Sequence, residues 1–270
     1  MIVRLVAMRS EARPIIEAEK LQGEPTPTPW PLYRSRCGGR ALVISGVGRT
    51  AMAGAAGWAV GHLTPPAHAG WVNLGIAGHS AAAVGTSLIA HKVVDRASGR
   101  AWYPPGLPGL DLPSDTLFTV DEPEFEYPAP GAWDMEAAAF LEATARWSLV
   151  ELTQVVKVVS DNPDASAERL DADAVSALIA ARLDDFEAVA ASLRAIAARL
   201  TARRPDSALM DAVVEGRRFT VTQRRQLARL LERYRALTGS DAEPKDWRAA
   251  DAGGTLSALS RAVENLAAGE

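Results

Sequence analysis

Short apolar segments alternate with segments of helical character from the N-terminus to about residue 201, and this alternation limits the possible folds more than any other feature. Apolar runs typical of strands occupy residues 2–8, 41–46, 70–75, 86–95, 116–120, 131–134 and 149–161. Helices are predicted at 11–20, 46–63 and 136–147, and apolar positions recur at helical spacing over 166–201. Strands that alternate with helices predict an α/β fold around a largely parallel or mixed sheet.

Composition excludes several classes of protein. The net charge of −4 over 270 residues gives no general attraction to nucleic acid or to an anionic membrane. The single cysteine, Cys37, excludes an intrachain disulfide and a multi-cysteine metal site. The N-terminal apolar stretch is too short for a signal peptide, and no apolar run reaches the roughly 18 residues that span a bilayer. We therefore expect a cytoplasmic protein with no metal and no cofactor.

Three carboxylates follow apolar strands at positions where a ligand would bind. Glu11, Glu136 and Asp161 each come just after a predicted strand, and glycine-rich turns follow the strands at 41–46 and 70–75. Ligands of open α/β sheets bind beyond the carboxyl ends of the strands. A strand-end acid taken alone most often caps a helix or lies in a solvated loop. Three acids at one edge instead favour a site in which carboxylates divide acid and base roles.

Five segments, in order and near the expected spacing, carry a family resemblance: MIVRLVAMRSEA, SGVGRTAMAGAAG, NLGIAG, WDMEAAAF and VVKVVSD. They resemble the purine nucleoside phosphorylase/uridine phosphorylase superfamily, and most closely the methylthioadenosine/S-adenosylhomocysteine nucleosidases, over roughly residues 1–200. The resemblance implies a three-layer phosphorylase/hydrolase-like fold, with a central mixed sheet flanked by helices. It also implies cleavage of the N-ribosidic bond of a purine-type nucleoside through an oxocarbenium-like sugar.

The resemblance implies a role for each residue that matches a family motif. Asp161 resembles the general acid that protonates the leaving purine at N7, and Glu11 resembles the residue that activates the attacking water. Glu136 resembles the acid that binds the ribose 2′- and 3′-hydroxyls. Further contacts are implied for Met135 under the sugar, for Ser160 beside the acid, for the backbone of Ile76, Ala77 and Gly78, and, near the nucleophile, for Gly46, Arg49 and Lys157.

The nucleophile is the main question that the resemblance leaves open. Asn73 and Ile76 stand where hexameric phosphorylases have an arginine and a serine, and an acid at Glu11 would repel phosphate. These three features favour water, and therefore a nucleosidase. A phosphorylase is the alternative, with phosphate as co-substrate, because three cations are present to hold a dianion: Arg9, Arg49 and Lys157.

Two departures from the family leave a second alternative. Ile76 replaces a serine that helps position water in the nucleosidases. The segment VDEPEFEYPAPGA replaces a helix that carries a base-stacking aromatic residue, for which Phe125 or Tyr127 would substitute. A catalytically silent nucleoside-binding or regulatory protein is therefore the second alternative. Retention of all three carboxylates favours an enzyme over this alternative, because binding alone has little need of them.

The resemblance ends near residue 203, so residues 203–270 are expected to form a helical appendage to an α/β domain at 1–202. The segment TVTQRRQLARLLERYRAL predicts an amphipathic helix, with Thr220 and Gln223 spaced as a capping box. Its apolar face must be covered by the main domain or by a partner chain. Acids interleave with its arginines, which argues against a nucleic-acid contact. We expect a homodimer with neither a nucleic-acid nor a membrane partner.

Overall fold

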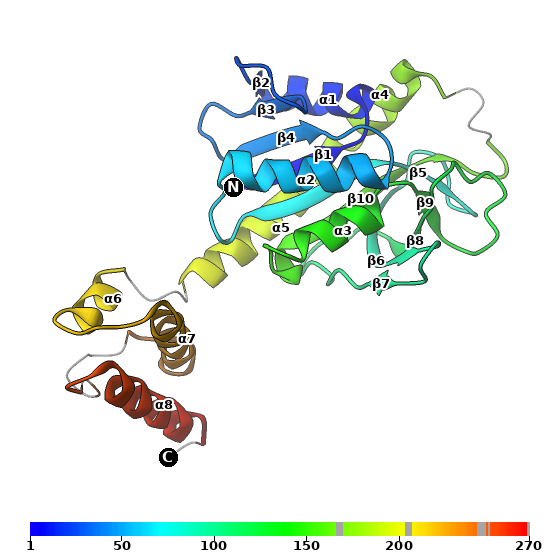
Figure 1. The fold of residues 1–270 in the computed structure, drawn as a ribbon. Coiled ribbons are helices and arrows are strands. Elements are labelled where there is room, and N and C mark those ends of the chain that lie inside the picture. The colour runs from blue at the N-terminus through cyan, green and yellow to red at the C-terminus, as the bar shows by residue number, and fades with distance from the viewer. Residues whose placement is uncertain (166–169, 203–206, 242–246, 248, 269–270) are drawn as a thin grey trace. The chain divides into compact units, whose positions relative to one another are not determined.

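The computed structural model describes residues 1–165, 170–202, 207–241, 247 and 249–268. The chain divides into two compact units, Met1–Ala197 and Ala198–Glu270 (Figure 1). The division falls within helix α5 (Leu183–Ala202), a few residues before the boundary expected from the sequence.

The first unit is built on a ten-stranded mixed sheet. Its strands are β1 (Ile2–Val6), β2 (Gln22–Gly23), β3 (Leu32–Arg34), β4 (Arg40–Ile44), β5 (Gly70–His79), β6 (Ser87–Asp95), β7 (Ala101–Trp102), β8 (Ser114–Thr119), β9 (Ala132–Asp134) and β10 (Thr153–Asp161). Strands β5, β10, β6, β8 and β9 pair in a closed circuit, while β1, β4, β3 and β2 extend the sheet from β5. Strand β1 pairs with the first half of β5 and β9 with its last two residues, so the β5 edge between them has no strand partner.

Helices cover both faces of this sheet (Figure 1). Residues alternate between the faces along each strand: on β1, Val3 and Leu5 join one apolar core while Ile2 and Val6 join the other. Helices α2 (Arg49–Leu63) and α3 (Ala137–Thr144) complete the first core. Helices α1 (Arg9–Glu19), α4 (Ala172–Ala180) and α5 complete the second. The predicted architecture, a mixed sheet flanked by helices with a C-terminal helical extension, is confirmed.

Several predicted elements have different bounds in the structure. Strand β5 does not stop at the glycine-rich segment but runs through it to His79, because β10 pairs alongside it as far as Gly78. Glycine is tolerated inside a strand where another group approaches closely. The helical periodicity over 166–201 belongs to two helices, α4 and α5, and residues 166–169 lie outside the described residues. The strand predicted at 149–161 begins later, at Thr153, because Val150–Leu152 form a 3₁₀ turn. The short strands β2, β3 and β7 carry too few residues for a periodic signal.

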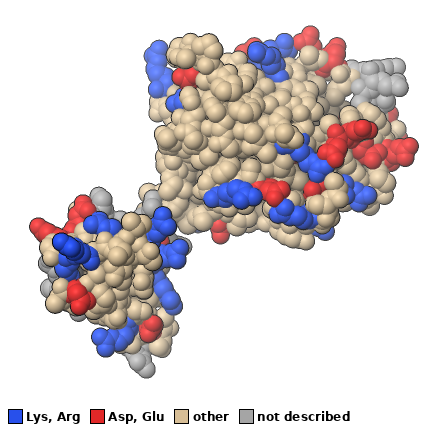
Figure 2. Space-filling model, viewed as in Figure 1, with Lys and Arg blue, Asp and Glu red and all other residues tan. Residues whose placement is uncertain are grey.

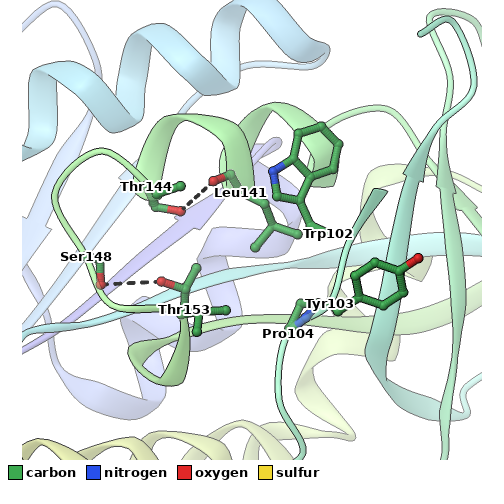
Figure 3. A pocket seen from close by; sticks show the side chains of 9 residues that line it. Trp102, Tyr103, Pro104, Leu141, Thr144, Ser148 and Thr153 are labelled. Atoms are coloured by element: carbon green, nitrogen blue, oxygen red, sulfur yellow. Dashed lines mark hydrogen bonds between the residues drawn. The ribbon is translucent and has the colours of Figure 1, made fainter. Parts of the chain in front are cut away.

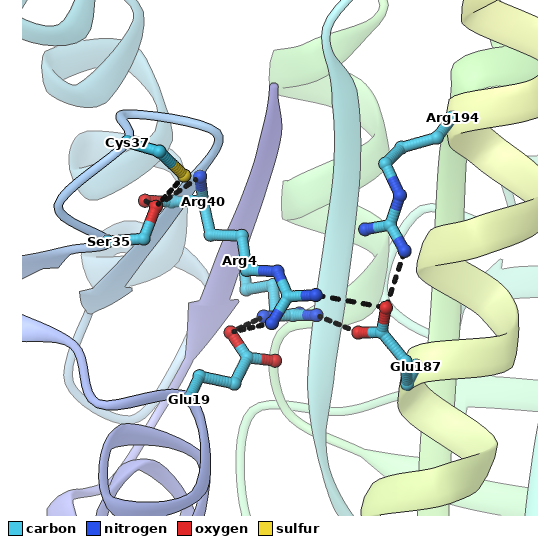
Figure 4. A network of polar contacts seen from close by, with 7 residues as sticks. All are labelled: Arg4, Glu19, Ser35, Cys37, Arg40, Glu187 and Arg194. Carbon is cyan, nitrogen blue, oxygen red and sulfur yellow. Dashed lines mark hydrogen bonds and ion pairs between the residues drawn. The ribbon is translucent and has the colours of Figure 1, made fainter.

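A buried arginine ties helices α1 and α5 to the sheet (Figure 4). Arg4 on β1 is 1% exposed; its Nη1 lies 2.5 Å from Glu19 Oε2 and its Nη2 lies 3.7 Å from Glu187 Oε2. Arg40 on β4 contacts the same two carboxylates at 3.6 and 3.0 Å. A buried cation is tolerated only when it is paired, so this network fixes the two helices against one another.

The second unit has an apolar core of its own. Helices α6 (Ser207–Val214), α7 (Val221–Thr238) and α8 (Ala252–Ala268) contribute to one cluster of buried side chains, which comprises Val213, Leu227, Leu231, Trp247, Leu256, Leu259 and Val263. The capping box of Thr220 and Gln223 is confirmed. The expectation that the main domain or a partner chain covers the apolar face of α7 is wrong for Leu227 and Leu231, because α8 packs on that face.

Candidate active site

A cavity of about 340 Å³ lies in the first unit, beyond the carboxyl ends of β1, β5 and β10. All three predicted carboxylates line it, together with five other predicted site residues: Ile76, Ala77, Gly78, Met135 and Ser160. The remaining wall comes from Met8, Val47, Val120, Pro123, Glu124, Phe125, Trp133, Asp134, Leu170 and Val175. The structure therefore gathers most of the predicted site into one pocket.

Three predicted site residues do not line this cavity: Gly46, Arg49 and Lys157. The Arg49 side chain is paired with two acids, since its Nε donates to Asp121 Oδ1 at 2.8 Å and its guanidinium also contacts Asp95. Gly46 has φ 86°, a left-handed conformation that suits glycine, before helix α2. Lys157 is buried behind the cavity wall, at 2% exposure.

Glu11 is held by backbone donors from the segment after β1 and from β5. Its Oε2 accepts hydrogen bonds from the N–H groups of Ala7 and Met8, and its Oε1 accepts one from Ile76 N–H, all at 2.9 Å. The Ile76 donor is free for this contact because it lies on the unpaired stretch of the β5 edge. Gly75 keeps this contact open, since a Cβ there would come within 2.5 Å of Glu11 Oε1. Burial raises the pKa of Glu11, and Lys157 and the three donors oppose this only in part.

Lys157 supplies a buried positive charge beneath the carboxylates. Its Nζ lies 2.9 Å from Asp134 Oδ2, and Asp134 also accepts from Thr119 Oγ1 and from Ala137 N–H. Burial by itself lowers the pKa of Lys157, but the neighbouring carboxylates outweigh burial and raise it, so the ammonium stays charged. Asp134 was not among the site residues predicted from the sequence. Its place directly before Met135 and Glu136 is the one sequence signal that could have pointed to it.

Glu136 precedes helix α3 and faces the cavity. Its Oε1 accepts a hydrogen bond of 2.7 Å from Gly48 N–H, from the loop before α2. Burial raises the pKa of Glu136 to about 7; the charge of Lys157 opposes this, and Asp134 and Glu11 add to it. Glu136 is therefore a carboxylate whose charge is costly in the unliganded protein, and a partner that donates hydrogen bonds to it is strongly favoured.

This raised pKa predicts a pH-dependent stability. The folded protein holds the Glu136 proton from the ordinary value of 4.5 up to about 7, whereas the unfolded chain releases it, so stability falls as pH rises through this window. The loss is on the order of 3 kcal/mol once the carboxyl is ionised. We expect Glu136→Gln to raise the melting temperature by several degrees at pH 8 and by little at pH 5, as measured by calorimetry. An equal gain at both pH values would contradict this assignment.

Asp161 ends β10 with both carboxylate oxygens bonded. Ser160 Oγ donates to Oδ1 and the Tyr127 hydroxyl donates to Oδ2. Of the two aromatic residues expected to substitute for the base-stacking residue, Phe125 lines the cavity and is 62% exposed. Tyr127 is buried and does not line the cavity. The hydroxyl contact of Tyr127 was not foreseen, because no local pattern relates residues 127 and 161.

A second cavity, of about 190 Å³, has different chemistry (Figure 3). It is lined by apolar and hydroxyl side chains, and the Thr144 and Thr153 hydroxyls are used in local hydrogen bonds. No carboxylate, lysine, arginine or histidine is among the described residues that line it. Nor do the described residues include a group of three His, Cys, Asp or Glu side chains placed to hold a metal ion. The cavity lined by Glu11, Glu136 and Asp161 is the candidate active site, because it gathers the three predicted carboxylates.

No family model matches the chain, and no curated protein sequence matches it. Solved structures do. The apo 5′-methylthioadenosine nucleosidase of Arabidopsis thaliana superposes with a TM-score of 0.60 at 18% identity, over 71% of this chain and 95% of that one. The 5′-methylthioadenosine/S-adenosylhomocysteine nucleosidase of Neisseria meningitidis, solved with methylthio-immucillin-A, gives 0.56 at 17% identity, over 68% and 96%. Futalosine hydrolase of Helicobacter pylori gives 0.54 at 15%, over 68% and 97%.

The chain has the nucleosidase fold. This confirms, at the level of fold, the resemblance to the nucleoside phosphorylase superfamily that the sequence motifs carry. At these identities the roles of individual residues depend on the geometry of this chain's own cavity.

Proposed function

We propose that the protein is an enzyme that hydrolyses the N-ribosidic bond of a purine-type nucleoside. The observation that carries the proposal is the convergence of Glu11, Glu136 and Asp161 on one cavity. They come from three separate parts of the chain, and each is almost fully buried. Burial raises the pKa of Glu11 and of Glu136, and carboxylates perturbed in this way in a cavity are candidates for a functional site. The shared fold with nucleosidases supports the same conclusion.

In the proposed reaction each carboxylate has one task. Glu136 accepts hydrogen bonds from the ribose 2′- and 3′-hydroxyls, and Met135 lies under the sugar. Asp161 gives a proton to the purine N7 as the bond between the sugar and the base breaks. The base takes the electron pair of that bond and leaves as a neutral molecule. The negative carboxylates stabilise the oxocarbenium-like sugar. Glu11 takes a proton from the water that attacks the anomeric carbon, and its Oε1 retains a lone pair for this step.

Water is the better candidate nucleophile because the cations that would hold phosphate are already engaged. Arg49 is paired with Asp95 and Asp121, and Lys157 with Asp134. Arg9 is exposed and is not among the lining residues. The described lining residues include five acids and no lysine or arginine, so the cavity wall offers a phosphate dianion no cationic side chain. The same charge balance favours a neutral or cationic nucleoside over one with a phosphate or carboxylate substituent.

The test is a panel of nucleosides incubated with and without inorganic phosphate, with products resolved by chromatography. We expect free base and free ribose in equal amounts, and no acceleration by phosphate. Accumulation of ribose 1-phosphate in proportion to base would establish the alternative, a phosphorylase. Tight binding of nucleosides with no base release would establish the silent nucleoside-binding protein.

The remaining expectations are part of the same proposal. The proposed reaction uses only side chains of the chain and water, so we propose that it needs no cofactor. We also propose that the protein is a cytoplasmic homodimer. The uncharged area at the centre of the first unit in Figure 2 lies over helix α2, in which Arg49 is the one Lys, Arg, Asp or Glu residue, and this area supports a dimer contact there. Light scattering of the purified protein measures its oligomeric state. Acidic and basic side chains are interspersed on the face that Figure 2 shows, without a continuous basic surface for nucleic acid. No described helix is long and apolar enough to cross a bilayer.

A further inference from the structure

A tyrosine hydroxyl lies against the carboxylate that we assign as general acid. Tyr127 Oη donates a hydrogen bond to Asp161 Oδ2, on the opposite oxygen from the one that Ser160 Oγ binds. Tyr127 is 8% exposed. Burial raises the pKa of Tyr127 and the hydrogen bond to Asp161 adds to this, so the hydroxyl keeps its proton and remains a donor over the physiological range.

Two further features accommodate this contact. Tyr127 has φ 48°, in the left-handed region, which a residue with a bulky side chain seldom adopts. Gly78 on β5 lies directly beneath the contact: a Cβ at this position would come within 2.6 Å of Tyr127 Oη and 3.0 Å of Asp161 Oδ2. The loop conformation and the absence of a side chain at Gly78 are thus both required to bring the hydroxyl to the acid.

We propose that Tyr127 is a positioning residue for the general acid, an inference that rests on the function proposed above. An ionised carboxylate has about four acceptor sites, and protonation turns one of them into a donor. Ser160 and Tyr127 occupy one on each oxygen, which fixes the plane of the carboxyl group and leaves the other sites facing the cavity. Tyr127 does not line the cavity, so it acts through Asp161 and not on the nucleoside. It holds Asp161 where its proton reaches the N7 atom of the bound base.

The distinguishing experiment compares two leaving groups. Tyr127→Phe removes one hydroxyl and keeps the ring. For a purine nucleoside, whose base needs a proton to leave, we expect kcat to fall roughly 10–100-fold, because a misplaced acid loses its alignment, while KM changes little. For p-nitrophenyl β-ribofuranoside, whose phenolate leaves without a proton, we expect almost no change. Tyr33→Phe is the matched control, since Tyr33 is a half-buried tyrosine on β3 outside the cavity.

A double-mutant cycle tests whether the effect passes through Asp161. In an Asp161→Asn background, Tyr127→Phe is expected to cause no further loss on the purine nucleoside, because residues that act as one unit are not additive. Equal losses on both leaving groups, or multiplicative losses in the double variant, would overturn the assignment and leave Tyr127 a structural residue.

Two other outcomes separate this inference from the proposed function. A wild-type protein that releases base from neither substrate overturns both. A wild-type protein that hydrolyses nucleosides, alongside a Tyr127→Phe variant of unchanged kcat, overturns only the role of Tyr127. Wild type and Tyr127→Phe are compared at a temperature below the melting temperature of the variant, which calorimetry determines beforehand.

Discussion

Asp161→Asn is expected to reduce turnover of a purine nucleoside by roughly 10²–10⁴-fold, the usual range for loss of a general acid. An amide has nearly the shape of the carboxyl group and still accepts one hydrogen bond, but it cannot deliver a proton to the base. The loss is measured as kcat by following release of free base. Because the bond that breaks in p-nitrophenyl β-ribofuranoside needs no proton, its hydrolysis should be affected far less.

The folded state has to be intact for this comparison. Ser160 and Tyr127 both donate hydrogen bonds to Asp161. In the variant, the amide NH₂ group is itself a donor, so it faces one of these two hydroxyl donors without an acceptor. A modest fall in melting temperature is therefore expected, and assays belong well below it. Glu142→Gln is a matched control, since Glu142 is a half-buried acid on α3, outside the cavity, that forms an ion pair with Arg100. Near-normal turnover by a folded Asp161→Asn protein would remove Asp161 from the mechanism.

Glu11→Gln is expected to have an effect of similar size, roughly 10²–10⁴-fold on hydrolysis, because the amide cannot accept a proton from water. The three backbone donors around Glu11 predict a second effect of the same substitution, on stability. The amide oxygen can serve Ala7 and Met8 N–H or Ile76 N–H, and its NH₂ group then faces the remaining donor. An unsatisfied buried donor costs about 1–3 kcal/mol, so stability should fall as well.

A measurement of substrate binding distinguishes activation of water by Glu11 from a role of Glu11 in shaping the pocket. If the variant is folded, affinity for a non-hydrolysable nucleoside analogue, measured by calorimetry, should change much less than kcat. This follows because the ribose hydroxyls are assigned to Glu136. A parallel loss of binding and turnover would indicate that Glu11 shapes the pocket and does not activate water.

Local sequence patterns determined the α/β class, most of the strands and the three carboxylates. This was possible because strand and helix periodicities are short-range properties, and because an acid just after an apolar strand is placed at the sheet edge by the strand itself. Glu11, Glu136 and Asp161 line one cavity for this reason. The amphipathic helix near the C-terminus and its capping box were identified on the same basis.

Tertiary structure alone decided which groups these carboxylates contact. Glu11 reaches Ile76 across 65 residues, Glu136 reaches Gly48 across 88, and Tyr127 reaches Asp161 across 34. Pairs so far apart in the chain leave no periodic signal, because their distance depends on how whole elements pack and on the gap that β1 and β9 leave along β5.

The same limit explains the expectations that failed or were incomplete. Arg49 and Lys157 carry the charge that phosphate would need, but only the fold shows that aspartates already neutralise both. Strand β5 continues through glycines that read locally as a turn, because β10 pairs beside them. Leu227 and Leu231 on the apolar face of α7 are covered by α8 within the second unit. In each case the residue type was visible in the sequence, whereas its partner, and with it the chemistry of the site, was set by contacts between distant segments.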